Sequence, residues 1–169
     1  MLVTLSALKS FPVQLEQLFG EVPSDYRHWT PETWDGIPSE SFTAIEQICH
    51  VRDIEVLGYH VRFRRMLAEE SPTLLSLDGY ALAEQRRYAE ADPADVFAAI
   101  RAAREQTLGL IEGLTEAQLR RTGLFAEYGR LSVKALIHYL CSHDQQHLAG
   151  IQWLLGKIES QSAYLRSAT

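Results

Sequence analysis

Hydrophobic residues recur every three or four positions along four long stretches of the chain, which is the spacing of an amphipathic helix. The first stretch covers residues 4–20, and Pro12 inside it predicts a helix that either starts two residues earlier or bends there. The second covers residues 44–69, where Thr43 and Glu46 have the spacing of a capping box that starts a helix. The pattern therefore predicts one amphipathic helix in each stretch.

The other two helical stretches lie in the second half of the chain. Asp92 is a good cap for a helix that begins at Pro93 and continues to about Gly113, because proline is favoured in the first turn. The last stretch covers residues 132–158, and the polar residues beyond Ser160 predict a frayed tail.

The segments between these helices are long and contain helix-breaking residues. Residues 22–40 hold three prolines together with Trp29 and Trp34, which we expect to close one end of the core, with ligand stacking as the alternative. Residues 72–91 form a second connection with one short helix, and residues 123–129 form a loop. No stretch shows a strand pattern or a repeat. The sequence therefore predicts an all-α four-helix bundle, whose long connections allow a topology other than up-down-up-down.

Length and composition are those of a single globular domain, residues 1–169, with 46% hydrophobic residues. With 16 basic and 22 acidic residues, the net charge of −6 argues against nucleic acid and anionic membranes as partners. We find no apolar run long enough to span a bilayer and no signal-peptide pattern at the start. Cys49 and Cys141 are expected to be buried, reduced thiols in a cytoplasmic protein.

Two histidines interrupt the hydrophobic face of the last predicted helix. His143 and His147 are one turn apart, so their Cβ atoms lie on one face, roughly 5–6 Å from each other. Burying a polar group without a partner costs roughly 1–3 kcal/mol, so two imidazoles in the core predict something for them to hold. A divalent metal is the simplest candidate, and histidines hydrogen-bonded within the core are the alternative. The hydrophobic positions of this face are Val133, Leu136, Leu140, Ile151, Leu154 and Ile158.

A third inward-facing histidine, His50, lies in the middle of the second predicted helix. If that helix is next to the last one in the bundle, His50, His143 and His147 converge in the interior. Three protein ligands with open positions are typical of a catalytic metal site, whereas structural zinc more often has four ligands. By the order of affinities, zinc, nickel, copper and cobalt all fit such a site, and the residues do not choose among them.

The remaining histidines are less favourably placed to bind a metal at this site. His138 lies about 140° around the helix from His143, which places it on the surface or against another helix. His60 is turned about 80° from His50, and His28 lies in the first connection, from where it reaches the mouth of a pocket. Both are candidates for a general base.

Among the acidic residues, Asp53 is the candidate catalytic carboxylate, because it lies one turn after His50. Its alternative roles are a fourth metal ligand, a hydrogen-bond acceptor behind a ligand, or an ion pair with an arginine. Glu46 is already accounted for by the capping box. Asp144 and Gln146 point to the sides of the histidine pair, which predicts contact with solvent or a supporting hydrogen bond rather than ligation.

Three segments around these residues resemble the DinB-like (DinB/YfiT-like) family of metal-dependent enzymes. The first is Phe42-Thr43-x-x-Glu46-x-x-x-His50, which is similar to the family's aromatic-Ser/Thr-x-x-Glu-x-x-x-His segment. His50-Val-Arg-Asp53 follows it directly, and the third segment is His143-Asp-Gln-Gln-His147. The resemblance covers most of the chain.

The resemblance implies a four-helix bundle, often a homodimer, that binds a divalent metal such as zinc or nickel at His50, His143 and His147. It also implies thiol-dependent chemistry, in which a low-molecular-weight thiol such as bacillithiol or mycothiol takes part in the transfer or isomerisation of a small molecule. A glutamine often follows the last histidine of the family by three positions, where this chain has Gly150. A shared substrate contact at that position is therefore in doubt.

The residues and the resemblance together predict a thiol-dependent transferase at a three-histidine metal site. A metal held by neutral imidazoles keeps its positive charge and deprotonates a bound thiol. One alternative is a metal-dependent hydrolase, in which the same site ionises water. The other is a metal-binding or stress-response bundle without catalytic activity.

Overall fold

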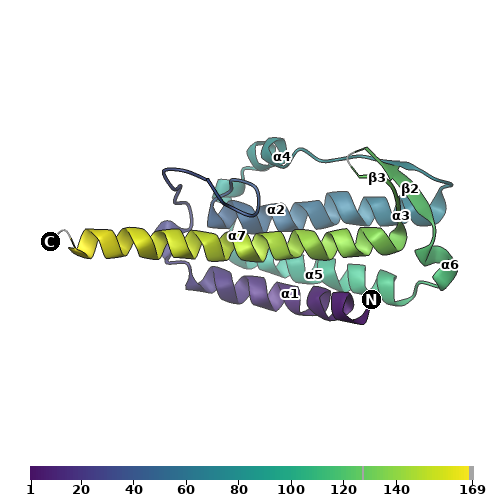
Figure 1. Cartoon of the computed structure of the whole chain (residues 1–169), viewed down its shortest axis with the longest axis horizontal. Helices are drawn as coiled ribbons and strands as arrows, with labels where there is room; N and C mark the ends of the chain where they lie inside the picture. The colour runs from purple at the N-terminus through teal and green to yellow at the C-terminus, as the bar shows by residue number, and fades with distance from the viewer. Residues whose placement is uncertain (127, 168–169) are drawn as a thin grey trace.

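Four long helices run alongside one another in the computed structural model, which describes residues 1–126 and 128–167 (Figure 1). From residue 162 onward only the backbone of the last helix is described. The second long helix is continuous but contains a π-helical turn, η2. The long helices are α1 (Leu2–Glu21), α2 (Ala44–Asp53) with η2 (Ile54–Tyr59) and α3 (His60–Ala68), α5 (Pro93–Glu112) and α7 (Val133–Ser167). The predicted four-helix bundle is confirmed.

Shorter elements connect these helices, and the predicted short helix of the second connection is among them. They are the 3-10 turns η1 (Ser24–Tyr26) and η3 (Tyr88–Glu90), the helices α4 (Gly79–Gln85) and α6 (Glu116–Leu119), and the strands β1 (Thr73–Leu74), β2 (Thr122–Phe125) and β3 (Gly129–Ser132). The predicted capping box is present, because Glu46 Oε2 accepts hydrogen bonds from the backbone and hydroxyl of Thr43 at 2.9 and 2.7 Å. Asp92 caps α5 by accepting from the backbone N–H of Ala94 at 2.7 Å.

The order of the helices around the bundle places α2 next to α7. Both α1 and α2 pack against α5 and against α7, so the cyclic order is α1, α5, α2, α7. Apolar side chains from all four helices fill the space between them, and their removal from water is the main force that holds the bundle together. Fully buried examples are Phe11 and Leu15 of α1, Ile48 of α2, Ile100 of α5 and Ile151 of α7. Residues on the facing sides of α2 and α7 therefore meet inside the molecule.

A small three-stranded sheet covers one end of the bundle, where the sequence predicts only a loop over residues 123–129 (Figure 1). β1 pairs in parallel with β2, and β2 pairs antiparallel with β3, with Phe125 opposite Gly129. The prediction of no strands is therefore wrong. The strands have at most four residues, which is too short for a clear alternation of hydrophobic and polar positions. Tertiary contacts stabilise them instead, since Phe125 and Leu131 are buried in the same core cluster as Met66.

Two helix boundaries differ from the prediction. α1 begins at Leu2 and continues through Pro12, which is itself buried, so packing outweighs the backbone hydrogen bond that proline removes. α7 continues past Ser160 to Ser167, and the intervening residues contain no glycine or proline that would end a helix. No helix in the described part of the chain is long and apolar enough to cross a membrane.

The first connection folds over the outside of the bundle, and its tryptophans pack against the core as predicted. Trp34 stacks on Trp153 of α7 with ring centroids 6.1 Å apart, and Trp29 packs against Tyr26 at 5.9 Å. Both tryptophans are partly buried against the core. The stacking of Trp34 on Trp153 fixes the connection against α7, close to the middle of that helix.

Both cysteines lie in helices, as predicted, and both are free thiols. Cys49 of α2 is buried, but Cys141 of α7 is partly exposed, which corrects the expectation of two buried thiols. Burial raises the pKa of the Cys49 thiol to about 12, although the charge of Arg52 opposes the shift. The Cys49 side chain therefore stays protonated and unreactive at neutral pH.

Candidate metal centre

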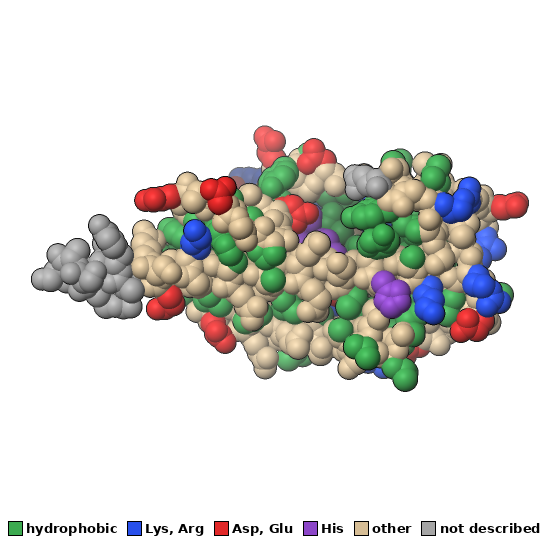
Figure 2. All heavy atoms as spheres, in the orientation of Figure 1, with side chains coloured by type: hydrophobic (Ala, Val, Ile, Leu, Met, Phe, Trp, Pro, Cys, Tyr) green, Lys and Arg blue, Asp and Glu red, His purple; other side chains and the backbone are tan. Residues whose placement is uncertain are grey.

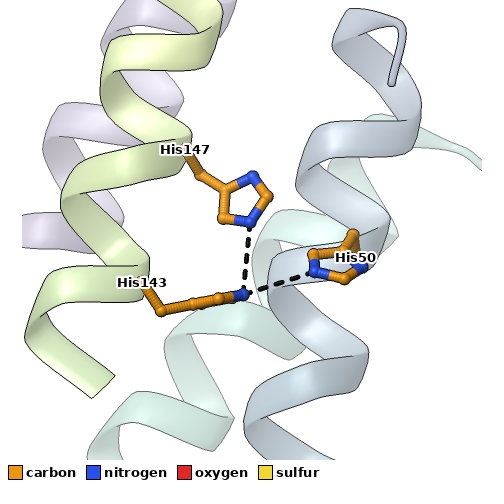
Figure 3. Close-up of side chains that lie close together, drawn as sticks. All are labelled: His50, His143 and His147. Atoms are coloured by element: carbon orange, nitrogen blue, oxygen red, sulfur yellow. Dashed lines mark hydrogen bonds between the residues drawn. The ribbon is translucent and has the colours of Figure 1, made fainter. Parts of the chain in front are cut away.

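The side chains of His50, His143 and His147 point toward one another inside the bundle (Figure 3). Nε2 of His143 lies 3.3 Å from Nε2 of His50 and 3.2 Å from Nε2 of His147. His50 comes from α2, and the other two come from successive turns of α7, so all three lie in the seam between these neighbouring helices. The convergence predicted from the sequence is present, and metal binding by these residues stays a prediction.

The distances between the nitrogens match those between ligands around one metal ion. Two nitrogens bound to zinc at about 2.0–2.1 Å in tetrahedral geometry lie about 3.3–3.4 Å apart. The two contacts in the cluster, at 3.3 and 3.2 Å, are close to this length. Neutral imidazole nitrogens that face one another need either shared protons or a common cation, and one cation at the centre satisfies all three nitrogens. The residues present therefore fit a divalent metal.

Gln47 determines which nitrogen of His147 carries the proton. The amide nitrogen of Gln47 donates to Ser39 Oγ at 2.8 Å and to the backbone carbonyls of Glu40 and Phe42 at 3.2 and 3.3 Å. The amide oxygen of Gln47 therefore faces His147 and accepts a hydrogen bond from its Nδ1. Because the proton is on Nδ1, Nε2 directs a lone pair into the site, as metal ligation requires.

Packing, rather than a hydrogen bond, positions His50. Its ring lies against Phe42, with ring centroids 5.2 Å apart, and against Gly79 at the start of α4. A Cβ at position 79 would lie 2.7 Å from Cε1 and 2.9 Å from Nδ1 of the imidazole. Nδ1 itself has no hydrogen-bond partner among the described residues. Glycine is therefore required at position 79 if the ring is to keep this place.

Burial keeps the three imidazoles neutral. Together with a smaller effect of the neighbouring His50, burial lowers the pKa of His143 to about 3. Burial also lowers the pKa of His147 well below its usual value, and the other two histidines add to the shift. The pKa of His50 is lowered by burial too, although the charges of Glu40 and Asp53 oppose the shift. Neutral imidazole is the form that binds a metal.

The structure adds Glu40, a residue that the sequence did not single out. Its Oε1 lies 3.5 Å from Nε2 of His50, and its Oε2 lies 3.4 Å from Nε2 of His147. The side chain is 37% exposed, so one face of the carboxylate contacts water. Glu40 lies in the connection between α1 and α2, where no helical or strand period indicates the direction of a side chain. No sequence signal points to it, because its position depends on how this connection folds over α7.

A pocket of 120 Å³ opens beside the histidines, and Glu40, His50 and His143 are among the residues that line it. Figure 2 shows histidine atoms in a recess on this face of the molecule, next to a group of hydrophobic side chains. The β2–β3 hairpin contributes to the pocket wall, which gives the unpredicted sheet a place in the site. The remaining wall residues include Ile54, Tyr59, Arg62, Phe125 and Tyr128.

A buried group of charges behind the histidines joins three helices. Arg104 of α5 donates paired hydrogen bonds to Glu55, at 2.9 and 3.0 Å, and to Asp144, at 2.8 and 3.0 Å. All three side chains are at most 2% exposed. Asp144 directly follows His143, and Glu55 lies in the π-helical turn, a feature frequent at functional sites. Of the two roles predicted for Asp144, solvent contact is excluded because its side chain is buried, and its paired hydrogen bonds with Arg104 leave the supporting role.

Asp53 lies outside the histidine cluster. Its carboxylate accepts hydrogen bonds from Arg52 at 2.8 Å, from Arg86 at 3.2 Å and from the hydroxyl of Tyr88 at 2.8 Å. Arg86 and Tyr88 lie just after α4 and in η3, and neither is among the residues that line the pocket beside the histidines. The structure thus places Asp53 in the ion-pair role that the sequence left as an alternative to the catalytic one.

The other histidines also lie away from the cluster in the described structure. His60 is buried, with Nε2 2.8 Å from Oγ1 of Thr107 and 3.2 Å from the backbone carbonyl of Ala103, so the core accounts for it. His138 lies on the surface with Nδ1 3.1 Å from Oγ1 of Thr4, as the angle around α7 predicts. His28 is exposed in the first connection and is not among the residues that line the pocket.

Gly150, one turn after His147, leaves space for the first connection. A Cβ at this position would overlap Ser39 Oγ and would lie 3.2 Å from the amide nitrogen of Gln47. The side-chain amide near the last histidine therefore comes from Gln47 of α2. The space beside Gly150 is filled by this protein's own side chains.

Comparison with known proteins supports the same fold. A family model described as the DinB superfamily matches residues 7–151. A solved structure described as "YfiT from Bacillus subtilis is a probable metal-dependent hydrolase with an unusual four-helix bundle topology" is similar with a TM-score of 0.78 and 25% sequence identity. The match covers 92% of this chain and 86% of that one. None of the curated proteins searched matches the chain.

Proposed function

This chain belongs to the DinB superfamily, whose model covers most of its length, and on that basis we propose that it is a metal-dependent hydrolase. The proposed ligands are His50, His143 and His147, and zinc or nickel is the proposed metal. One observation carries the proposal: three neutral imidazoles present their Nε2 atoms to one point at the separations of metal ligands. The similar YfiT structure, described as a probable metal-dependent hydrolase, favours hydrolysis as the reaction.

The chain's own residues define what the site does for a substrate. A divalent ion held there supplies a Lewis acid and lowers the pKa of a bound nucleophile. The three imidazoles carry no charge, so they leave the charge of the ion uncompensated. Phe125 and Tyr128 of the hairpin exclude water from one side of the pocket. Arg62, held by the backbone carbonyl of Leu75 at 2.9 and 3.2 Å, adds a positive charge that favours an anionic or carbonyl-bearing substrate.

Transfer of a low-molecular-weight thiol is the second candidate reaction. The neutral imidazoles do not compensate the positive charge of the ion, and this charge stabilises a thiolate. The three histidines therefore suit a thiol as well as water. The pocket of 120 Å³ exceeds the ~30 Å³ that a water molecule occupies, so it accepts part of a larger nucleophile or substrate. A homodimer and a small-molecule substrate complete this proposal, and sedimentation of the purified protein tests the first of them.

Turnover assays test the proposed reaction. We expect metal-loaded protein to hydrolyse members of a panel of esters, amides and other activated small molecules, and His143→Ala to lose this activity. The matched control is His138→Ala, which removes an exposed imidazole from the same helix and should keep full activity. Turnover that requires an added thiol would select the transferase. Metal binding without turnover of any compound, with or without thiol, would favour a non-catalytic metal-binding bundle.

A further inference from the structure

We propose that Glu40 is a fourth protein ligand of the metal, supplied by the connection between α1 and α2. The inference rests on the proposed function only in requiring that the three histidines hold a metal. It assigns a metal contact to a residue outside the helices and outside the histidine pattern.

The distances of the Glu40 carboxylate carry the inference. A carboxylate oxygen and an imidazole nitrogen, both about 2.0–2.2 Å from one zinc ion in tetrahedral geometry, lie about 3.3–3.5 Å apart. Glu40 Oε1 is 3.5 Å from Nε2 of His50, and Oε2 is 3.4 Å from Nε2 of His147. These are the same two nitrogens that face Nε2 of His143 at 3.3 and 3.2 Å. The carboxylate therefore belongs to the same group of converging donor atoms.

The hydrogen bond that His147 donates indicates that a cation lies between its Nε2 and the Glu40 carboxylate. The Gln47 amide oxygen accepts the hydrogen bond that Nδ1–H of His147 donates, so Nε2 directs a lone pair toward Oε2 of the carboxylate. A carboxylate oxygen also presents lone pairs, and two groups of lone pairs repel at this distance. A cation between them removes the repulsion, and a metal at the centre of the histidine cluster is in the right place.

The backbone around Glu40 is held in position by the same residue that orients His147. The buried amide of Gln47 donates to Ser39 Oγ and to the Glu40 carbonyl, and Ser39 Oγ donates to the same carbonyl at 3.2 Å. On the other side, the backbone N–H of Ser41 donates to the Tyr80 hydroxyl at 3.1 Å. Both neighbours of Glu40 are thus fixed, which limits the positions that the carboxylate can reach.

Glu40 covers one side of the metal position and leaves another side open. The carboxylate approaches His50 and His147, and the pocket that it lines together with His50 and His143 also reaches Tyr59 and Phe125. A zinc site accepts a fifth ligand during reaction, and a site with three nitrogens and one carboxylate oxygen retains this capacity. Substrate is therefore expected to enter from the side of Tyr59 and Phe125.

Cobalt binding tests the inference without an activity assay. Co²⁺ is titrated into metal-free wild-type protein, Glu40→Ala and Glu40→Gln, and both the affinity and the visible absorption spectrum are recorded. We expect Glu40→Ala to lose about 100-fold or more in affinity, at or beyond the upper end of the 10–100-fold typical of residues that only support a ligand. The spectrum should also change, because one donor oxygen is replaced. Glu84→Gln removes an exposed carboxylate from nearby α4 and should change neither readout.

The outcomes separate this inference from the proposed function. Glu40→Ala with wild-type affinity and spectrum, while His147→Ala no longer binds Co²⁺, would overturn the role of Glu40 alone. Wild-type protein that binds no Co²⁺ would overturn both proposals. Circular dichroism of the metal-free variants checks the fold, and Glu40→Gln keeps the size of the side chain, so a loss of affinity in this folded variant supports the inference.

Discussion

Replacing Arg104 with methionine tests the buried charges that hold α5, α7 and the π-helical turn together. Arg104 makes four hydrogen bonds to Glu55 and Asp144 and one to the backbone carbonyl of Leu8 at 2.8 Å. Methionine keeps much of the volume but leaves both buried carboxylates without the cation that pairs with them, and Glu55 keeps only the hydrogen bond from the Thr107 hydroxyl. Removing one member of a buried ion pair typically costs about 3–5 kcal/mol. A domain of this size loses about 2–4 °C in melting temperature per kcal/mol, so we expect a decrease of about 6–20 °C.

Thermal unfolding of the metal-free protein measures this effect, with Arg101→Met as the matched control. Arg101 lies one turn earlier on α5 and pairs with Glu16 at 2.6 Å, but both side chains are about half exposed. An exposed pair contributes about 0–1 kcal/mol, so the control should change the melting temperature by less than about 4 °C. A melting temperature of Arg104→Met within the range of the control would refute the reasoning that these charges stabilise the bundle.

Three further predictions concern the histidines and the residues that position them. Gly79→Ala should push His50 out of place and lower metal affinity by about tenfold or more, while Gly109→Ala, whose Cβ meets no atom within 4 Å, should leave affinity unchanged in the same titration. Gln47→Leu removes the acceptor that orients one imidazole, so isothermal titration should show about 10–100-fold weaker metal binding in a folded protein. The pKa of His143 is about 3 in the folded state, below the ordinary value of about 6.5, so the unfolded chain binds this proton first. The free energy of unfolding of the metal-free wild type should therefore fall between about pH 6.5 and pH 3, and by more than that of the His143→Gln variant. Urea unfolding at several pH values measures both. Equal losses of stability in the two proteins would contradict this assignment.

The helices and the histidine cluster could be predicted because both depend on local spacing. The capping box of Thr43 and Glu46 and the proline after Asp92 mark helix starts with residues only a few positions apart. His143 and His147 interrupt a hydrophobic face at the spacing of one turn, and that interruption alone is enough to single them out. The third histidine joins them because the bundle brings α2 next to α7.

The rest of the site could not be predicted because it depends on contacts between distant segments. Arg104 meets Glu55 across 49 residues of sequence, and a charge on a helix gives no sign of such a partner. Glu40 reaches the histidines only through the path of the first connection. The ion-pair role of Asp53 could not be predicted either, because its partners Arg86 and Tyr88 lie in a connection whose course no periodicity reveals.

Metal content of the purified protein tests the central claim most directly. After saturation with Zn²⁺ or Ni²⁺ and removal of loosely bound ions, elemental analysis should find one ion per wild-type chain, and the same in His138→Ala. His50→Ala and His143→Ala should each retain almost none. Equal metal content in wild type and in both of these variants, or no bound ion in the wild type, would contradict the account and leave the three histidines as hydrogen-bonded core residues.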